Sequence, residues 1–175
     1  MRKRGRSLFR ELLEIVVIAL ILTFVIQTWV VETFVVEGDS MLDSLHDGDR
    51  VLVNKFIYNF SEPRRGEVVI FAHPGENSRD LIKRVVGTPG EIVEIRSGEV
   101  LVNGEPIEED YPNRPDSSDF PPTKVPPRTI FVLGDNRGNS DDSRSFGFVP
   151  YSEIRGRTWL IFWPPSSFAI VGSTL

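Results

Sequence analysis

Ser40 lies in the stretch Gly38-Asp39-Ser40-Met41, shortly after the longest apolar run of the chain. A serine hydroxyl is a weak nucleophile because it keeps its proton at neutral pH unless a nearby base accepts it. The sequence contains no cysteine, which excludes thiol catalysis, disulfide bonds and cysteine-based zinc sites. Ser40 is therefore either a turn residue or a nucleophile, and the choice depends on a partner elsewhere in the chain.

The chain has two histidines, which are the usual partners of a nucleophilic serine. His46 lies in the turn-like stretch "LHDGD", and His73 precedes Pro74 at the end of an expected strand. Folding could bring either one to Ser40. Neither has sequence neighbours that would orient an imidazole, so we interpret both as structural turn residues.

Lysine is the other possible base, and the chain contains four lysines against sixteen arginines. Lys83 lies in "DLIKRVVGTPG" next to Arg84, and alternation in a strand puts the two on opposite faces, so one cation must point toward apolar side chains. Burial can lower a lysine pKa by about 3 to 5 units from about 10.4, whereas arginine cannot usefully lose its proton. Spacing alone nevertheless favours a structural pair of charges that protects an edge strand from aggregation. Lys55 ends another expected strand and is interpreted as a surface residue.

These residues are expected to be positioned by a mainly β domain over residues 32–175, an antiparallel barrel or sandwich without a long amphipathic helix. Its short apolar runs are separated by Gly, Pro, Asn and Asp. Ser97-Gly98 and Asn103-Gly104 predict tight hairpins. Residues 105–127 are rich in proline and acidic side chains and predict a surface excursion. The expected strands are "ETFVVE", "RVLVNKFIY", "EVVIFA", "LIKRVVG", "EIVEIR", "EVLVNG", "TIFVLGD" and "TWLIFW".

A helix over residues 12–31 is expected to be a transmembrane anchor, because twenty helical residues span about 30 Å of hydrocarbon. Basic residues crowd the segment 1–11, which predicts that this end is cytoplasmic and that residues 32–175 are extracytoplasmic. A cleaved secretory signal would need a shorter apolar core with small residues at the cut. A buried core helix of this length would normally show a polar stripe.

Near the end of the sequence, "WLIFWPPSSFAI" is unusually apolar. Trp163 and Phe168 are either part of a core strand or part of a surface that rests on the membrane, since exposed apolar patches mark such contacts. The formal net charge of −5 argues against a nucleic-acid partner, which would require a basic face.

Residues 134–147, "GDNRGNSDDSRSFG", combine hydroxyl groups, carboxylates and arginines that could orient a lysine and keep the loop rigid. With this loop the sequence resembles bacterial type I signal peptidases, also called leader peptidases. Four blocks match in order, which is specific in combination, and the resemblance covers essentially the whole chain. The small size and single apolar span are similar to the compact form of Gram-positive bacteria. The blocks are "GDSM" with "DGDRVLVNKF", then "KRVVGTPGE", then "LGDNRGNSDDSRSFGFVP".

The resemblance implies that Ser40 is the nucleophile and Lys83 the general base. Ser140 would form a hydrogen bond with the lysine amine and orient it. Asp142 and Arg144 would form the ion pair that supports the loop.

Substrate contacts also follow from the resemblance. Phe34, Val36 and Ile82 match positions that line shallow apolar pockets for small side chains before the cut. The Ser40 backbone N–H would donate to the oxyanion. Gly38 stands where some members have a serine donor, so it could offer only its backbone.

Other positions of the same blocks are expected to support the site. Asp135 and Asn136 would shape the loop, and Met41 would pack beneath Ser40. The family usually has "SMxPTL", whereas this chain has "SMLDSL", with Asp43 for proline and Ser44 for threonine. Aspartate can still support a turn, although it adds a negative charge three residues after the nucleophile.

The function implied is a membrane-bound serine endopeptidase that removes signal peptides from secreted preproteins after a small-x-small motif. Its partners would be signal peptides and membrane lipid, and no metal or cofactor is implied. A self-cleaving repressor-type protease also pairs serine with lysine, but it should carry a DNA-binding domain where this chain has its apolar segment. A catalytically silent, membrane-anchored β-module that binds signal peptides is the remaining alternative.

Overall fold

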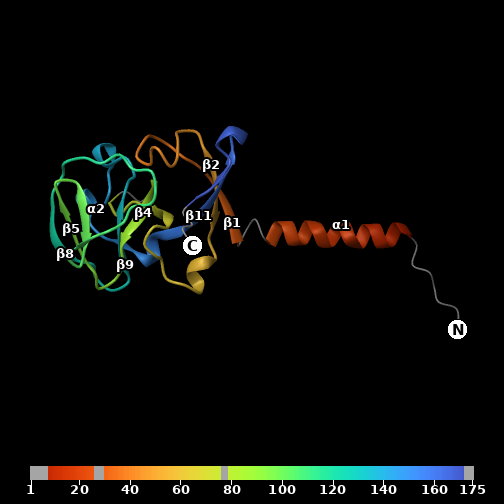
Figure 1. Ribbon diagram of the computed structural model, residues 1–175. Helices are drawn as coiled ribbons and strands as arrows, with labels where there is room; N and C mark the ends of the chain where they lie inside the picture. The colour runs from red at the N-terminus through yellow and green to blue at the C-terminus, as the bar shows by residue number, and fades with distance from the viewer. Residues whose placement is uncertain (1–7, 26–29, 76–78, 172–175) are drawn as a thin grey trace.

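The computed structural model describes residues 8–25, 30–75 and 79–171 of the chain. Figure 1 shows a β domain and one long helix, α1 (Leu8–Val25), that extends away from it. The named strands form two sheets in which every pairing is antiparallel. The expectation of a mainly antiparallel β domain is therefore confirmed.

The larger sheet has the strand order β1-β2-β11-β3-β4-β9-β10, and β12 also pairs with β11. Its strands are β1 (Val31–Val35), β2 (Arg50–Asn54), β3 (Val68–Ala72), β4 (Asp80–Gly87), β9 (Thr129–Leu133), β10 (Val149–Pro150), β11 (Ile154–Trp163) and β12 (Ala169–Ile170). β4 lies between β3 and β9, with Lys83 opposite Val69 and Arg84 opposite Leu133. The interpretation of Lys83 and Arg84 as edge-strand charges is therefore wrong.

The smaller sheet has the order β7-β6-β5-β8. Its strands are β5 (Ile92–Arg96), β6 (Glu99–Val102), β7 (Glu105–Pro106) and β8 (Phe120–Lys124). Positive φ angles at Ser97, Gly98, Asn103 and Gly104 give the two hairpin turns the backbone twist that connects neighbouring strands. Both hairpins predicted from these residue pairs are present.

Several segments depart from the expected strand pattern. β2 ends at Asn54 because its side-chain oxygen accepts the backbone N–H groups of Phe56 and Ile57, and a 3₁₀ helix follows instead of a longer strand. Within the expected excursion 105–127, residues 105–106 form β7 and residues 120–124 form β8 despite its prolines. β8 is an edge strand of the smaller sheet. Proline lacks a backbone N–H group, and an edge strand tolerates this because one of its sides has no neighbouring strand to receive a hydrogen bond.

The short helices lie at the ends of strands. Figure 1 shows α2 at the end of the domain that the smaller sheet forms. They are η2 (Ile57–Asn59), η3 (Arg137–Asn139), α2 (Ser143–Phe146), η4 (Tyr151–Glu153) and η5 (Pro165–Ser167).

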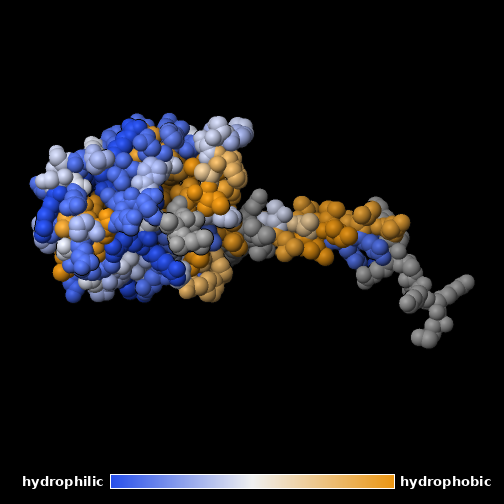
Figure 2. Space-filling view, viewed as in Figure 1, coloured by the Kyte–Doolittle hydropathy of each residue, from blue (hydrophilic) through white to orange (hydrophobic). Residues whose placement is uncertain are grey.

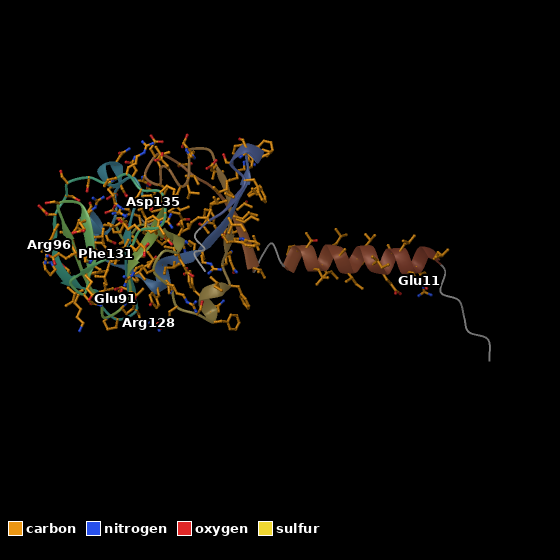
Figure 3. The ribbon with its side chains drawn as sticks, viewed as in Figure 1. Glu11, Glu91, Arg96, Arg128, Phe131 and Asp135 are labelled. Atoms are coloured by element: carbon orange, nitrogen blue, oxygen red, sulfur yellow. The ribbon has the colours of Figure 1, made fainter. Side chains whose placement is uncertain are left out.

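Apolar side chains from both sheets form the core. One cluster joins the two sheets, and Phe131 of β9, labelled in Figure 3, belongs to it together with Val93 of β5 and Val100 of β6. A second cluster packs beneath residues 36–45 and includes Met41, fully buried as expected, and Ile82 of β4. These clusters hold β4 between two packed layers.

Helix α1 carries exposed apolar side chains along its length. In the part of the chain that the structure describes, no helix combines the length and apolarity needed to cross a membrane. The predicted anchor over residues 12–31 includes residues 26–29, and the predicted segment 1–11 includes residues 1–7, all of which lie outside the described residues.

Candidate active site

Ser40 and Lys83, which are 43 residues apart in sequence, meet at the floor of a cleft. The Lys83 amine donates a hydrogen bond to Ser40 Oγ at 2.7 Å and a second one to the backbone oxygen of Ile82 at 3.0 Å. Lys83 is 2% exposed because β4 is covered on both faces. A hydroxyl group and an amine that could act as nucleophile and base are therefore within direct proton-transfer distance.

Burial lowers the pKa of Lys83 to about 8, because the charged ammonium loses its hydration. The nearby carboxylates of Asp142, Asp141 and Asp135 oppose this shift, whereas the positive charge of Arg79 adds to it. With such a pKa, roughly a tenth of the lysines are neutral at pH 7, against less than about 0.1% for an unperturbed side chain. The site therefore maintains a usable population of the basic form.

The turn that carries Ser40 is held by the loop after β9. The Asn136 backbone N–H donates to the Ser40 carbonyl oxygen at 3.0 Å, and the Asn136 side-chain amide donates to the carbonyl oxygen of Asp39 at 3.0 Å. Met41, the residue after Ser40, is buried in the core. Asn136 thus fixes the backbone on both sides of the nucleophile's peptide unit.

Gly134 permits the close approach between this loop and the Ser40 turn. A Cβ at position 134 would lie 2.5 Å from the Ser40 carbonyl oxygen and 2.2 Å from Ser140 Oγ. Both contacts are too short for any side chain, so glycine is required here. A glycine at the end of a buried strand was the available sequence signal, but the sequence alone does not say what approaches it.

Ser140 differs from the expectation. Its Oγ is buried beside Gly134 and has no hydrogen-bond partner among the described residues. The predicted hydrogen bond from Ser140 to the Lys83 amine is therefore absent, because the amine donates to Ser40 and to the Ile82 carbonyl instead.

Asp142 and Arg144 form the expected ion pair, at 2.8 Å between Arg144 Nη2 and Asp142 Oδ2. Asp142 is fully buried and also accepts the backbone N–H groups of Arg144 and Gly134. Arg144 in addition donates to the carbonyl oxygen of Arg137. One carboxylate thus connects the beginning of the loop to its end.

The second cation of β4, Arg84, is as buried as Lys83 but has a different environment. It forms a bidentate pair with Asp135, at 2.8 Å from Nε to Oδ1 and 2.7 Å from Nη2 to Oδ2. It also donates to the Gly66 carbonyl oxygen and to Ser44 Oγ. In Figure 3 the labelled Asp135 lies within the β domain, on the loop that also carries Asn136. Arg84 is therefore held in an ion pair, and the sequence did not indicate this role.

Gly38 was expected to offer only its backbone N–H to an oxyanion, and in the structure this N–H is already used. The Gly38 N–H already donates to the carboxylate of Asp47 at 2.8 Å. In contrast, the Ser40 N–H has no acceptor among the described residues. The free donor beside the nucleophile is therefore the backbone N–H of Ser40 itself.

The cleft has a volume of about 750 Å³ and runs between β1 and β4. The three predicted substrate residues, Phe34, Val36 and Ile82, all line it, as do Ser40 and Lys83. Val36 and Ile82 also belong to the buried core, so the wall of the cleft is apolar at these two residues.

Neither histidine contacts Ser40 among the described interactions. His46 lies 3.9 Å from Asp49, and its side chain is more than half exposed. His73 Nε2 lies 3.3 Å from the Asp141 carboxylate. In the described part of the chain, no group of three or more His, Asp or Glu side chains is arranged to hold a metal ion.

Comparison with known proteins gives consistent matches. The family model "Signal peptidase, peptidase S26" matches residues 9–163. A signal peptidase I from Leptolyngbya laminosa is 43% identical over 142 residues, covering 77% of this chain and 70% of that protein. A probable signal peptidase I-1 from Synechocystis sp. is 37% identical over 172 residues, covering 94% and 87%. Signal peptidase I T from Bacillus subtilis is 36% identical over 174 residues, covering 93% and 89%.

Proposed function

The chain belongs to the signal peptidase family, peptidase S26, and on this premise we propose that it is a serine endopeptidase that removes signal peptides from secreted preproteins. The observation that carries the proposal is the buried Lys83 amine, which donates to Ser40 Oγ at the floor of a cleft. Lys83 is the general base and Ser40 the nucleophile.

The reaction is acyl transfer in two halves. Neutral Lys83 accepts the Ser40 proton while Ser40 Oγ attacks the scissile carbonyl carbon, and the resulting ammonium then protonates the leaving amine as the C–N bond breaks. In the second half, Lys83 accepts a proton from water, which attacks the ester carbon. The Ser40 oxygen leaves with the lysine's proton, and the signal peptide is released with a free carboxylate.

The free Ser40 N–H is one oxyanion donor for this reaction. It is on the same residue as the attacking oxygen, so it needs no rearrangement to reach the tetrahedral intermediate. Because the Gly38 N–H is committed to Asp47, we do not assign it as the second donor.

Substrate selection follows from the cleft between β1 and β4. β1 is the outer strand of the larger sheet, so an extended peptide can add main-chain hydrogen bonds along it. Alternate side chains of that peptide would then face the pockets of Phe34, Val36 and Ile82. These core residues leave little depth, so small side chains are accepted before the cut and large ones are excluded.

The membrane determines where this site works. The apolar segment 12–31 anchors the chain in the cell membrane, with segment 1–11 cytoplasmic and the β domain outside. Figure 2 shows hydrophobic residues on α1 and on the part of the β domain nearest to it. Trp163 and Phe168 are 52% and 65% exposed, which supports the interpretation that this surface rests on lipid. Ser40 follows the anchor by nine residues and so lies near the membrane surface.

Cleavage of a membrane-inserted preprotein reporter with an Ala-x-Ala site tests this function. The full chain, Ser40→Ala and Lys83→Ala would be compared after their folding has been checked by circular dichroism. We expect the unmodified chain to cut after the second small residue and both variants to lose activity. Cleavage by Lys83→Ala would reassign the base, and a well-folded but inactive parent chain would favour a signal-peptide-binding module.

A further inference from the structure

Residues 107–119 contact both elements that carry the dyad, although the segment contributes nothing to the cleft. The segment runs from β7 toward β8 and crosses behind the Ser40 turn, the loop after β9 and the side chain that follows Lys83. It contains most of the proline-rich and acidic stretch that sequence patterns place on the surface. Its contacts are specific and come from both backbone and side chains.

On the nucleophile side, Arg114 forms an ion pair with Asp43, at 2.5 Å from Nη2 to Oδ1 and 3.2 Å from Nε to Oδ2. The hydrogen bond from Arg114 lowers the pKa of the Asp43 carboxyl. The next turn residue, Ser44, donates from its hydroxyl to the Pro112 carbonyl oxygen at 3.3 Å. The turn after Ser40 is therefore attached to residues 107–119 by the Asp43 carboxylate and by the Ser44 hydroxyl.

The same arginine also holds the loop after β9. The Arg114 backbone N–H donates to the Asp135 carbonyl oxygen at 2.8 Å, and its carbonyl oxygen accepts the Arg137 N–H at 3.0 Å. These bonds enclose Asn136, whose N–H donates to the Ser40 carbonyl oxygen. Arg114 therefore joins the two segments between which Ser40 lies.

On the base side, the ring of Tyr111 lies over the guanidinium of Arg84, 3.8 Å from its Cζ to the ring centroid. Arg84 follows Lys83 in β4 and is paired with Asp135. The segment is thereby attached to the strand that carries the base as well as to the turn that carries the nucleophile.

Both ends of the segment are fixed independently of these contacts. Glu109 pairs with Arg137, and Asp116 and Ser118 accept hydrogen bonds from Arg144. At Gly98 a Cβ would lie 2.0 Å from the Asp116 carbonyl oxygen, so the β5–β6 hairpin packs directly on the segment's backbone.

We propose that residues 107–119 set the separation of Ser40 and Lys83, with Arg114 as a positioning residue whose side chain acts through Asp43. The proposal rests on the proposed peptidase function. The Asp43 and Arg114 side chains are about half exposed, at 49% and 52%, and such pairs add little to folding stability. Small displacements of reacting groups, in contrast, have large effects on rate. Loss of the pair should therefore reduce turnover while the domain stays folded.

The experiment measures kcat and KM on the Ala-x-Ala reporter for Asp43→Ala, Arg114→Ala, the double variant, and the exchanged pair Asp43→Arg with Arg114→Asp. Arg96→Ala is the matched control, because Arg96 is an exposed arginine paired with Glu94 in the smaller sheet (Figure 3). We expect each single variant to lower kcat about tenfold with KM within about twofold. The double variant should be no worse than the singles, the exchanged pair should recover part of the loss, and Arg96→Ala should match the parent.

A second readout follows the Lys83 amine by NMR with labelled lysine, which is practical because the chain has four lysines and Lys83→Met assigns the signal. If Arg114→Ala releases the Ser40 turn, water reaches the amine and its titration midpoint rises from about 8 toward the ordinary lysine value. An unchanged kcat and an unchanged midpoint in Arg114→Ala would overturn the proposal. An inactive parent chain would instead contradict the peptidase function, and the NMR midpoint would still decide the positioning role.

Discussion

The region around Ser40 and the smaller sheet are stabilised in different ways. Between β4 and the loop after β9, five charged side chains are buried within one region, Lys83, Arg84, Asp135, Arg137 and Asp142. The smaller sheet contributes apolar side chains to the core, and its hairpins turn at local residue pairs. Buried charges, in contrast, depend on each partner being present. The difference teaches that the region around Ser40 depends on pairing between distant segments, whereas the hairpins of the smaller sheet depend on local residue pairs.

The largest effect is expected from a substitution of Lys83, which should change turnover and the free energy of unfolding in different ways. Lys83→Met removes the proposed base but keeps a long side chain without a charge. We expect turnover to fall by about 10³-fold or more, because Ser40 then has no proton acceptor. The free energy of unfolding at pH 7 should stay constant or rise, because a buried ammonium is replaced by an apolar group. Reporter cleavage and urea unfolding measure both, and a less stable Lys83→Met would show that the amine contributes net stability.

Arg84→Ala tests whether the second cation of β4 is structural. Removing it leaves Asp135 buried without its ion pair, and we expect a loss of about 3 to 5 kcal/mol in the free energy of unfolding. Arg96→Ala in the smaller sheet should leave the urea midpoint unchanged. If the two variants unfolded at the same urea concentration, the contrast between the regions would fail.

The pH dependence follows from the lowered pKa of Lys83. Activity should rise with pH as the amine loses its proton, with a midpoint near 8 in kcat/KM. For stability, the folded chain loses this proton at about pH 8 and the unfolded chain near the ordinary lysine pKa. Between these values the unfolded state binds more protons, so stability rises with pH by about 3 kcal/mol.

Urea unfolding of the parent chain and Lys83→Met across this pH range isolates the contribution of one amine. The difference between them should be constant below pH 8 and shrink above it. A difference independent of pH would mean that burial does not shift this lysine.

The smallest effect is expected in a hairpin of the smaller sheet. Asn103 has a φ of 54°, a conformation that asparagine adopts more easily than alanine. Asn103→Ala should lower the free energy of unfolding by about 1 kcal/mol and leave kcat, KM and the pH midpoint unchanged. Thermal unfolding and the reporter assay check this, and a change in the pH midpoint would show that the two regions are coupled.

Much of the fold was predictable because its signals are local. Ser97-Gly98 and Asn103-Gly104 predict hairpins wherever the strands lie, since the turn conformation is a property of the pair. β8 was missed because prolines argue against a strand until the strand is known to lie at an edge. The 3₁₀ turn after Asn54 depends on a side-chain cap that competes with strand extension.

The site was partly predictable for a similar reason. The blocks around Ser40, Lys83 and residues 134–147 carry a resemblance, so their members could be named in advance. The roles of Gly134 and Arg114 could not, because each depends on a backbone approached from a distant segment. Ser140 Oγ has no partner among the described residues, where the resemblance implies a bond to the lysine.

By itself, the sequence determined an antiparallel β domain after an apolar segment, a serine in a turn, and a lysine that becomes a base only if it is buried. It could not decide which cation of β4 faces the serine, because alternation separates Lys83 from Arg84 without saying which face is polar. Tertiary structure decided this by placing Asp135 against Arg84 and Ser40 against Lys83. The reason is physical: a pKa depends on hydration and neighbouring charge, and both are properties of the folded surroundings.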